Sequence, residues 1–230
     1  MPYYGYYLDP TYLLVILGYI LCALASSNVK HTFKKYGQVM NRSGLTGADV
    51  AQRILQSQGI YDVRVEHVTG ELTDHYDPAS KVVRLSDTVY GQTTISAVSV
   101  AAHECGHAVQ HAKGYVPLTL RSAIYPVVNI SSMAAVPLLI IGFILGLTGL
   151  AQIGLILFAF VLAFQVITLP VEFNASSRAL RILEGSGYLM EEEMGGAKKV
   201  LFAAALTYVA SVASTALQLL RFAMMLNRRR

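Results

Sequence analysis

The chain has 230 residues, of which 54% are hydrophobic and only 14% are charged, a composition that excludes an ordinary soluble domain. Its net charge of +4 comes mainly from Lys and Arg beside apolar runs, which is typical of membrane topology, so we expect no nucleic-acid partner. Cys22 and Cys105 lie in segments with no reason to meet, and no disulfide framework is predicted.

The first apolar run, residues 12–25, predicts a membrane anchor in an N-terminal segment 1–29. Its length also suits a secretory signal peptide, and residues 23–25 resemble a cleavage site. However, no Lys or Arg precedes the run, and the basic cluster follows it at residues 30–35. A signal peptide has the opposite arrangement, so the flanks favour a retained anchor.

Residues 30–125 are predicted to form a soluble α+β portion. Thr46 can cap a short amphipathic helix whose apolar residues recur at helical spacing as far as Leu55. Two β-prone stretches, 63–68 and 81–85, follow, and turn-forming residues precede the second. We therefore expect a helix and then a β-hairpin or a three-stranded sheet.

The stretch 93–113 predicts a buried helix that contains the motif HExxH, with His103, Glu104 and His107. Two histidines four positions apart lie on one helix face, about 6 Å apart at Cβ, so both imidazoles can bind one zinc ion. Glu104 then lies beside the metal, where it can act as the general base for the attacking water and protonate the leaving amine. The motif predicts a Zn²⁺ cofactor, His103 and His107 as ligands, and Glu104 as the catalytic residue.

A purely structural interpretation of the motif is less favoured, because a His-Glu pair is costly to bury in an apolar helix without a metal. Gly106 lowers helix propensity, but it permits another backbone to approach closely, as is natural beside a metal site. His111 lies about 12 Å along the helix axis from His103, too far to share the ion. Gln110 replaces the glycine of the longer metzincin pattern. A third ligand must therefore come from another segment.

Two further apolar runs, 127–147 and 150–169, are each long enough to cross a membrane and are separated by a tight turn. They predict a transmembrane hairpin over residues 126–170, which returns the chain to the side of the HExxH helix. We expect a new helix after Pro170, with Glu172 in its first turn. An acidic residue against a membrane span is a functional candidate, and capping of the helix N-terminus is the alternative.

The last segment, 171–230, contains an apolar stretch at 200–226 whose polar residues recur at helical spacing. It predicts a packed helix that can span the membrane, and basic residues at both ends leave its C-terminal side undecided. The basic cluster at 30–35 predicts a multi-pass plasma-membrane protein with both ligand segments facing the cytoplasm.

Most of residues 43–183 resembles the YugP-like membrane zinc metallopeptidases, in the ordered blocks SGLTGADVAQRIL, GELTDHYDP, VVRLSDTVYG, AAHECGHAVQ and PVEFNASSRAL. The resemblance implies an HExxH peptidase whose third ligand is a glutamate after a transmembrane hairpin, in a layout similar to the HtpX-like membrane gluzincins. It thus implies Glu172 as the third zinc ligand. Asn174 stands where the family usually has Asp, and it is a further candidate for a place around the ligands.

The resemblance also draws attention to the polar stretch 74–78. His75 or Tyr76 could stabilise the oxyanion, but an ordinary hydrogen-bonded turn is the favoured interpretation.

The expected fold class is mainly α, with multi-pass membrane helices and a small α+β soluble insertion that carries the HExxH active-site helix. The expected function is that of a membrane-embedded zinc metallo-endopeptidase, with the lipid bilayer as its surroundings and proteins or peptides, including membrane proteins, as substrates. Two alternatives are a catalytically idle zinc-binding membrane scaffold and a metal-dependent hydrolase of a non-peptide substrate such as lipid.

Overall fold

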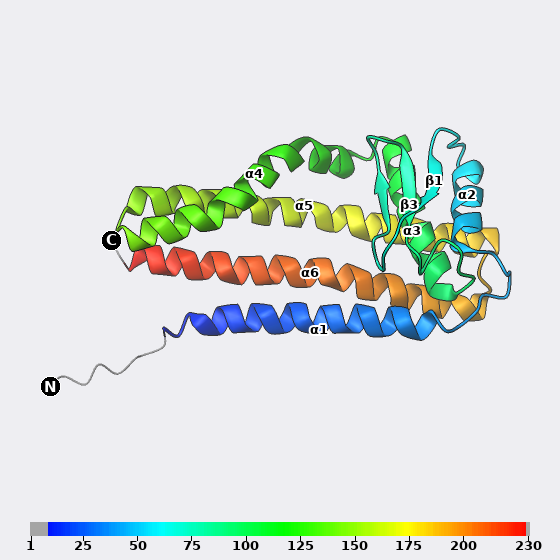
Figure 1. The fold of residues 1–230 in the computed structure, drawn as a ribbon, viewed down its shortest axis with the longest axis horizontal. Helices are drawn as coiled ribbons and strands as arrows, with labels where there is room; N and C mark the ends of the chain where they lie inside the picture. Colours follow the sequence, from blue (N-terminus) through cyan, green and yellow to red (C-terminus); the bar gives the residue numbers. More distant parts are fainter. Residues whose placement is uncertain (1–8, 229–230) are drawn as a thin grey trace. The chain divides into compact units, whose positions relative to one another are not determined.

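The structure, a computed structural model, describes residues 9–228, in which six helices and three strands follow one another (Figure 1). The elements are α1 Tyr12–Tyr36, α2 Gly47–Ser57, β1 Arg64–His67, β2 His75–Asp77, β3 Val82–Leu85, α3 Ile95–Ala112, α4 Val116–Ile144, α5 Thr148–Ser186 and α6 Glu191–Asn227. The expectation of a mainly α fold with a small α+β portion is confirmed.

The chain divides into two compact units. Within the described residues, one contains 9–24, 124–166 and 208–228, and the other contains Ala25–Ala123 and Ile167–Thr207. We call them the apolar unit and, after the HExxH motif that predicts catalysis, the catalytic unit. Cys22 belongs to the first and Cys105 to the second, and both are free.

Four described helices, α1, α4, α5 and α6, are long and apolar enough to cross a membrane. In the apolar unit, α4 and α5 form the predicted hairpin and approach closely at two glycines. A Cβ on Gly142 would lie 2.5 Å from the backbone nitrogen of Ala151, and a Cβ on Gly154 would lie 2.8 Å from that of Leu139. Small residues of this kind let the backbones of apolar helices approach closely, so that the helices pack through van der Waals contacts.

Pro170 does not begin a new helix as predicted, because it lies inside α5, which continues to Ser186. A proline within a helix leaves one carbonyl without its usual donor, but apolar helices tolerate it where neighbouring groups satisfy that carbonyl. Glu172 is consequently far from the start of α5. The alternative of helix N-terminal capping is wrong for Glu172, since such capping acts only within the first turn.

The sheet of the catalytic unit has the strand order β1-β3-β2, with β1 parallel and β2 antiparallel to β3. The three-stranded alternative is therefore confirmed. The favoured turn for the stretch 74–78 is wrong for His75–Asp77, which forms β2 and pairs with β3. The pairing partner supplies backbone hydrogen bonds that the local sequence does not reveal. The turn predicted just before residues 81–85 is confirmed, and there Asp77 accepts hydrogen bonds from the backbone of Ala79 and Ser80.

The predicted helix at residue 46 is confirmed as α2, where Thr46 and Asp49 form a reciprocal capping box. The core of the catalytic unit packs α2 and β3 against α3, through fully buried residues such as Ile54, Leu85 and Val98. Figure 1 shows α2, α3 and the strands grouped together.

Gly106 lies at the closest approach of α3 to α5. A Cβ on Gly106 would lie 2.6 Å from the carbonyl oxygen of Ala175, so only glycine leaves room for this contact. The expectation that another backbone approaches Gly106 is confirmed. This approach brings the HExxH helix beside the segment that carries Glu172.

Candidate metal centre

Three side chains of the catalytic unit converge on one point: His103 and His107 from α3, and Glu172 from α5. Glu172 Oε2 lies 3.4 Å from His103 Nε2 and 3.6 Å from His107 Nε2. One ligand atom from each of the three residues lies within 4.8 Å of the other two. The structure therefore brings together the three residues that the motif and the resemblance named.

The separations of Glu172 Oε2 from the two histidine nitrogens suit a zinc ion. Ligands bound tetrahedrally to zinc at about 2.0–2.1 Å lie about 3.3 Å from one another, close to the separations of Oε2 from the two nitrogens. Glu172 is only 2% exposed, and its Oε2 is a buried oxygen with no hydrogen-bond partner in the described part of the chain. A buried carboxylate oxygen without a donor is costly unless a cation neutralises it.

A chain of hydrogen bonds sets the tautomer of His107. Arg178 Nε can only donate, and it donates to Asn174 Oδ1 at 2.7 Å. Gln110 Nε2 donates to the same oxygen at 3.0 Å and to the backbone carbonyl of Val171 at 2.8 Å. Gln110 Oε1 must then accept, and it lies 3.1 Å from His107 Nδ1. A proton on Nδ1 leaves the Nε2 lone pair of His107 free to bind a metal.

His103 has a comparable partner on its far nitrogen. Its Nδ1 lies 3.1 Å from the hydroxyl of Ser176, one turn after Glu172 on α5. A hydroxyl can accept from Nδ1, which again leaves Nε2 for the metal. Both imidazoles are thus held through one nitrogen while the other faces Glu172.

Arg121, from the first part of α4, holds the opposite oxygen of Glu172. Its Nη1 donates to Oε1 at 3.0 Å, so Oε1 is occupied and Oε2 points toward the two imidazoles. Arg121 thereby favours binding of the metal through a single carboxylate oxygen.

Replacing Arg121 with alanine should weaken zinc binding about 10- to 100-fold, the usual effect of removing a group that orients a ligand. Removing the positive charge of Arg121 would also relieve some of its repulsion of zinc. That repulsion is screened, because the guanidinium is 33% exposed and contacts Oε1, so the lost orientation of Glu172 should dominate. Competition with a zinc-binding dye measures the affinity. The affinity of Arg121→Lys should lie between those of the wild type and Arg121→Ala. The exposed Arg53→Ala is the control, and unchanged affinity in Arg121→Ala would contradict the positioning role.

Glu104 follows His103 on α3 and is only 8% exposed. Burial raises the pKa of Glu104 to about 7, although His103 opposes the shift and the backbone N–H of Tyr76 also stabilises the carboxylate. A pKa near neutral pH suits a group that must accept a proton and later release it.

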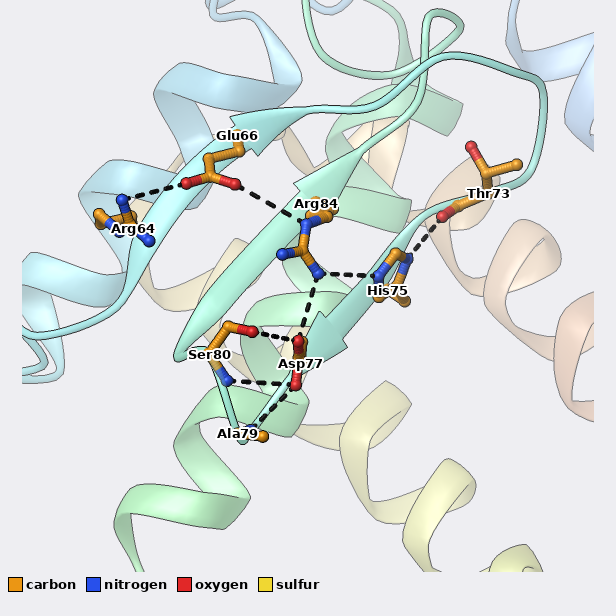
Figure 2. A network of polar contacts seen from close by, with 8 residues as sticks. All are labelled: Arg64, Glu66, Thr73, His75, Asp77, Ala79, Ser80 and Arg84. Carbon is orange, nitrogen blue, oxygen red and sulfur yellow. Dashed lines mark hydrogen bonds and ion pairs between the residues drawn. The ribbon is translucent and has the colours of Figure 1, made fainter. Parts of the chain in front are cut away.

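The two candidates for stabilising the oxyanion, His75 and Tyr76, lie on opposite faces of β2. Figure 2 shows His75 on the face that carries Arg84 and Asp77, with His75 Nδ1 2.8 Å from the backbone carbonyl of Thr73. Successive side chains of a strand point to opposite faces. Tyr76 accordingly points the other way, and its hydroxyl lies 2.7 Å from Nδ1 of the exposed His111. Tyr76 therefore reaches α3, whereas His75 is engaged on the sheet surface.

Sequence reasoning missed the roles of Gln110, Ser176 and Arg121 around the ligands. Gln110 is fully buried, and a polar residue three positions after His107 in an apolar helix is a usable signal. Ser176 follows Glu172 by one helical turn, which is a weaker signal of the same kind. Nothing in the sequence pairs Arg121 with Glu172, because they lie on different helices.

Comparisons with known proteins agree with this arrangement. A family model described as "Putative neutral zinc metallopeptidase" matches residues 11–227. The chain is similar to "Putative membrane protease YugP" of Bacillus subtilis (strain 168), with 53% identity over 200 residues that cover 87% of this chain and 89% of the relative. No solved structure matches the chain.

Proposed function

Because the chain belongs to this neutral zinc metallopeptidase family, we propose that it is a membrane-embedded peptidase with zinc held by His103, His107 and Glu172. The observation that carries the proposal is the convergence of two imidazole nitrogens on one buried, donor-free carboxylate oxygen. Three protein ligands leave a fourth position open, as catalytic zinc sites require.

Zinc bound there would supply a Lewis acid for the scissile carbonyl and would lower the pKa of water. Glu104 is the proposed base, which accepts a proton from the attacking water and passes it to the leaving amine. Tyr76 remains a candidate donor to the oxyanion because it lies on the face of β2 that reaches α3.

An extended peptide is the substrate that the sheet supports best. β2 is an edge strand in the order β1-β3-β2, and it contacts α3. β2 thus lies beside the helix that carries the proposed base, and Tyr76 of β2 reaches His111 of that helix. Exposed strand edges bind extended peptides through backbone hydrogen bonds, a mode that a lipid substrate cannot use.

We further propose that the catalytic unit faces the cytoplasm. Its basic cluster at residues 30–35 lies at the C-terminal end of α1, after the apolar run of that helix, and the positive-inside rule places such a cluster in the cytoplasm. Reporter fusions after residues 90 and 185 should both report the cytoplasm. Opposite reports from the two fusions would contradict a site shared by α3 and α5.

The direct test is cleavage of unfolded membrane proteins and peptides by the purified full-length chain. Activity should disappear with a zinc chelator and return with added zinc. Full zinc occupancy without cleavage of any such substrate would favour the idle scaffold. Turnover of lipid in place of peptide would favour the non-peptide hydrolase.

A further inference from the structure

A cavity of about 590 Å³ lies between α5 and α6 in the catalytic unit. Phe173 and Leu180 of α5, with Phe202 and Ala205 of α6, form most of its apolar wall. Phe173 is 42% exposed and Phe202 is 60% exposed, so large apolar surfaces remain uncovered on this wall. An uncovered apolar wall of this kind is typical of a site for an apolar ligand.

The polarity of the cavity changes along the two helices. Phe173 and Ala205 lie toward the apolar stretches into which α5 and α6 continue, whereas Arg181, Lys198 and Lys199 line the opposite end. The helical rise separates Phe173 from Arg181 by about 12 Å. The cavity is therefore apolar near the candidate membrane spans and cationic farther from them.

In the described part of the chain, the basic side chains at the cationic end have no acidic partners. In residues 9–228, no Asp or Glu lies within ion-pair distance of Arg181, Lys198 or Lys199, all of which are exposed. Arg181 instead donates to the backbone carbonyl of Ser177. Glu184 is the one carboxylate among the lining residues, so the described lining has an excess of positive charge.

We propose that this cavity binds an anionic phospholipid, with its phosphate among the three basic side chains and its acyl chains along Phe173 and Phe202. The order of polar and apolar parts in the cavity matches that of a lipid in the adjoining leaflet. Each basic side chain close to an anionic headgroup contributes attraction, and the apolar wall adds affinity for acyl chains that a free inorganic anion cannot gain.

The proposed lipid would contact Ser176, which holds one of the candidate zinc ligands. Ser176 lines the cavity, and its hydroxyl lies 3.1 Å from His103 Nδ1. This role goes beyond peptide hydrolysis, and it can be measured as binding in the inactive Glu104→Gln variant. A failure of peptidase activity would therefore leave the lipid result interpretable.

The test uses the full-length chain purified in detergent and mixed with equal amounts of phosphatidylglycerol and phosphatidylcholine, with retained lipid counted by native mass spectrometry. The wild type should retain phosphatidylglycerol preferentially. A variant with Arg181, Lys198 and Lys199 changed to Gln should retain on the order of 100-fold less, from a factor of about five per basic side chain. Ser177→Trp, which fills the cavity and keeps the charges, should also lose the lipid.

The matched control changes Lys30, Lys34 and Lys35 to Gln, which removes the same charge outside the cavity and should leave retention unchanged. An equal loss in this control would overturn the proposal, because general charge attraction would explain the binding. Unchanged retention in the cavity variants that remain monodisperse and zinc-loaded would also overturn it. Full displacement by soluble glycerol phosphate would reduce the site to an anion site and overturn the role of the acyl chains.

Discussion

Replacing Glu104 with Gln should lower the rate of peptide hydrolysis by about 100- to 10,000-fold, the range typical of losing a general base. Zinc content should stay near one ion per chain, because His103, His107 and Glu172 still provide the three protein ligands. Glu104 is buried and has a pKa near 7, so its site already accepts a neutral carboxyl group near neutral pH. A neutral amide of the same shape should leave the fold unchanged.

Metal analysis and a peptide-cleavage assay on the same preparation check this result. Glu191→Gln, in the exposed first turn of α6, is the matched control and should keep both zinc and activity. Two outcomes would argue against the assigned role of Glu104. One is retained hydrolysis, and the other is loss of zinc together with activity, which would make Glu104 a ligand.

Replacing Glu172 with Ala should abolish hydrolysis by a different route, through loss of the metal. Two neutral imidazoles bind zinc far more weakly than two imidazoles with a carboxylate, so affinity should fall by more than the roughly 100-fold seen for groups around the ligands. The change also leaves the guanidinium of Arg121 without its carboxylate partner. Zinc titration of the purified variant measures the loss.

The Glu172 experiment separates loss of metal from loss of fold. His103→Ala should lose zinc in the same way, and both variants should elute as the wild type does in size-exclusion chromatography. Full zinc retention in Glu172→Ala would remove that residue from the site and direct attention to Glu184 or to the aspartates of residues 74–77. Those aspartates are already engaged, since Asp74 accepts from Ser86 and Asp77 accepts from Ser80.

The sequence by itself determined the features that depend on nearby residues. The spacing of His103 and His107 places both on one face of a helix, and this relation holds wherever the helix packs. Thr46 could be recognised as a cap because its partner Asp49 is three positions away. Long apolar runs likewise indicate candidate spans, since length and hydropathy are local properties.

The pairing of Glu172 with the two histidines depends on a long-range contact, and from the residues alone it was only a candidate. The resemblance to a family supplied the assignment. The contact that brings α5 to α3 is a backbone approach at Gly106, which the sequence could suggest but not locate.

Only the tertiary structure decided the elements whose hydrogen bonds come from distant residues. His75–Asp77 is a strand because β3 pairs with it. The structure also places Pro170 inside α5, where the sequence had predicted the start of a new helix. Arg121 reaches the site through a contact between α4 and α5, and Asn174 reaches it through a contact between α5 and α3. Such partners leave no periodic signal in the chain, since each contact joins residues more than 50 positions apart.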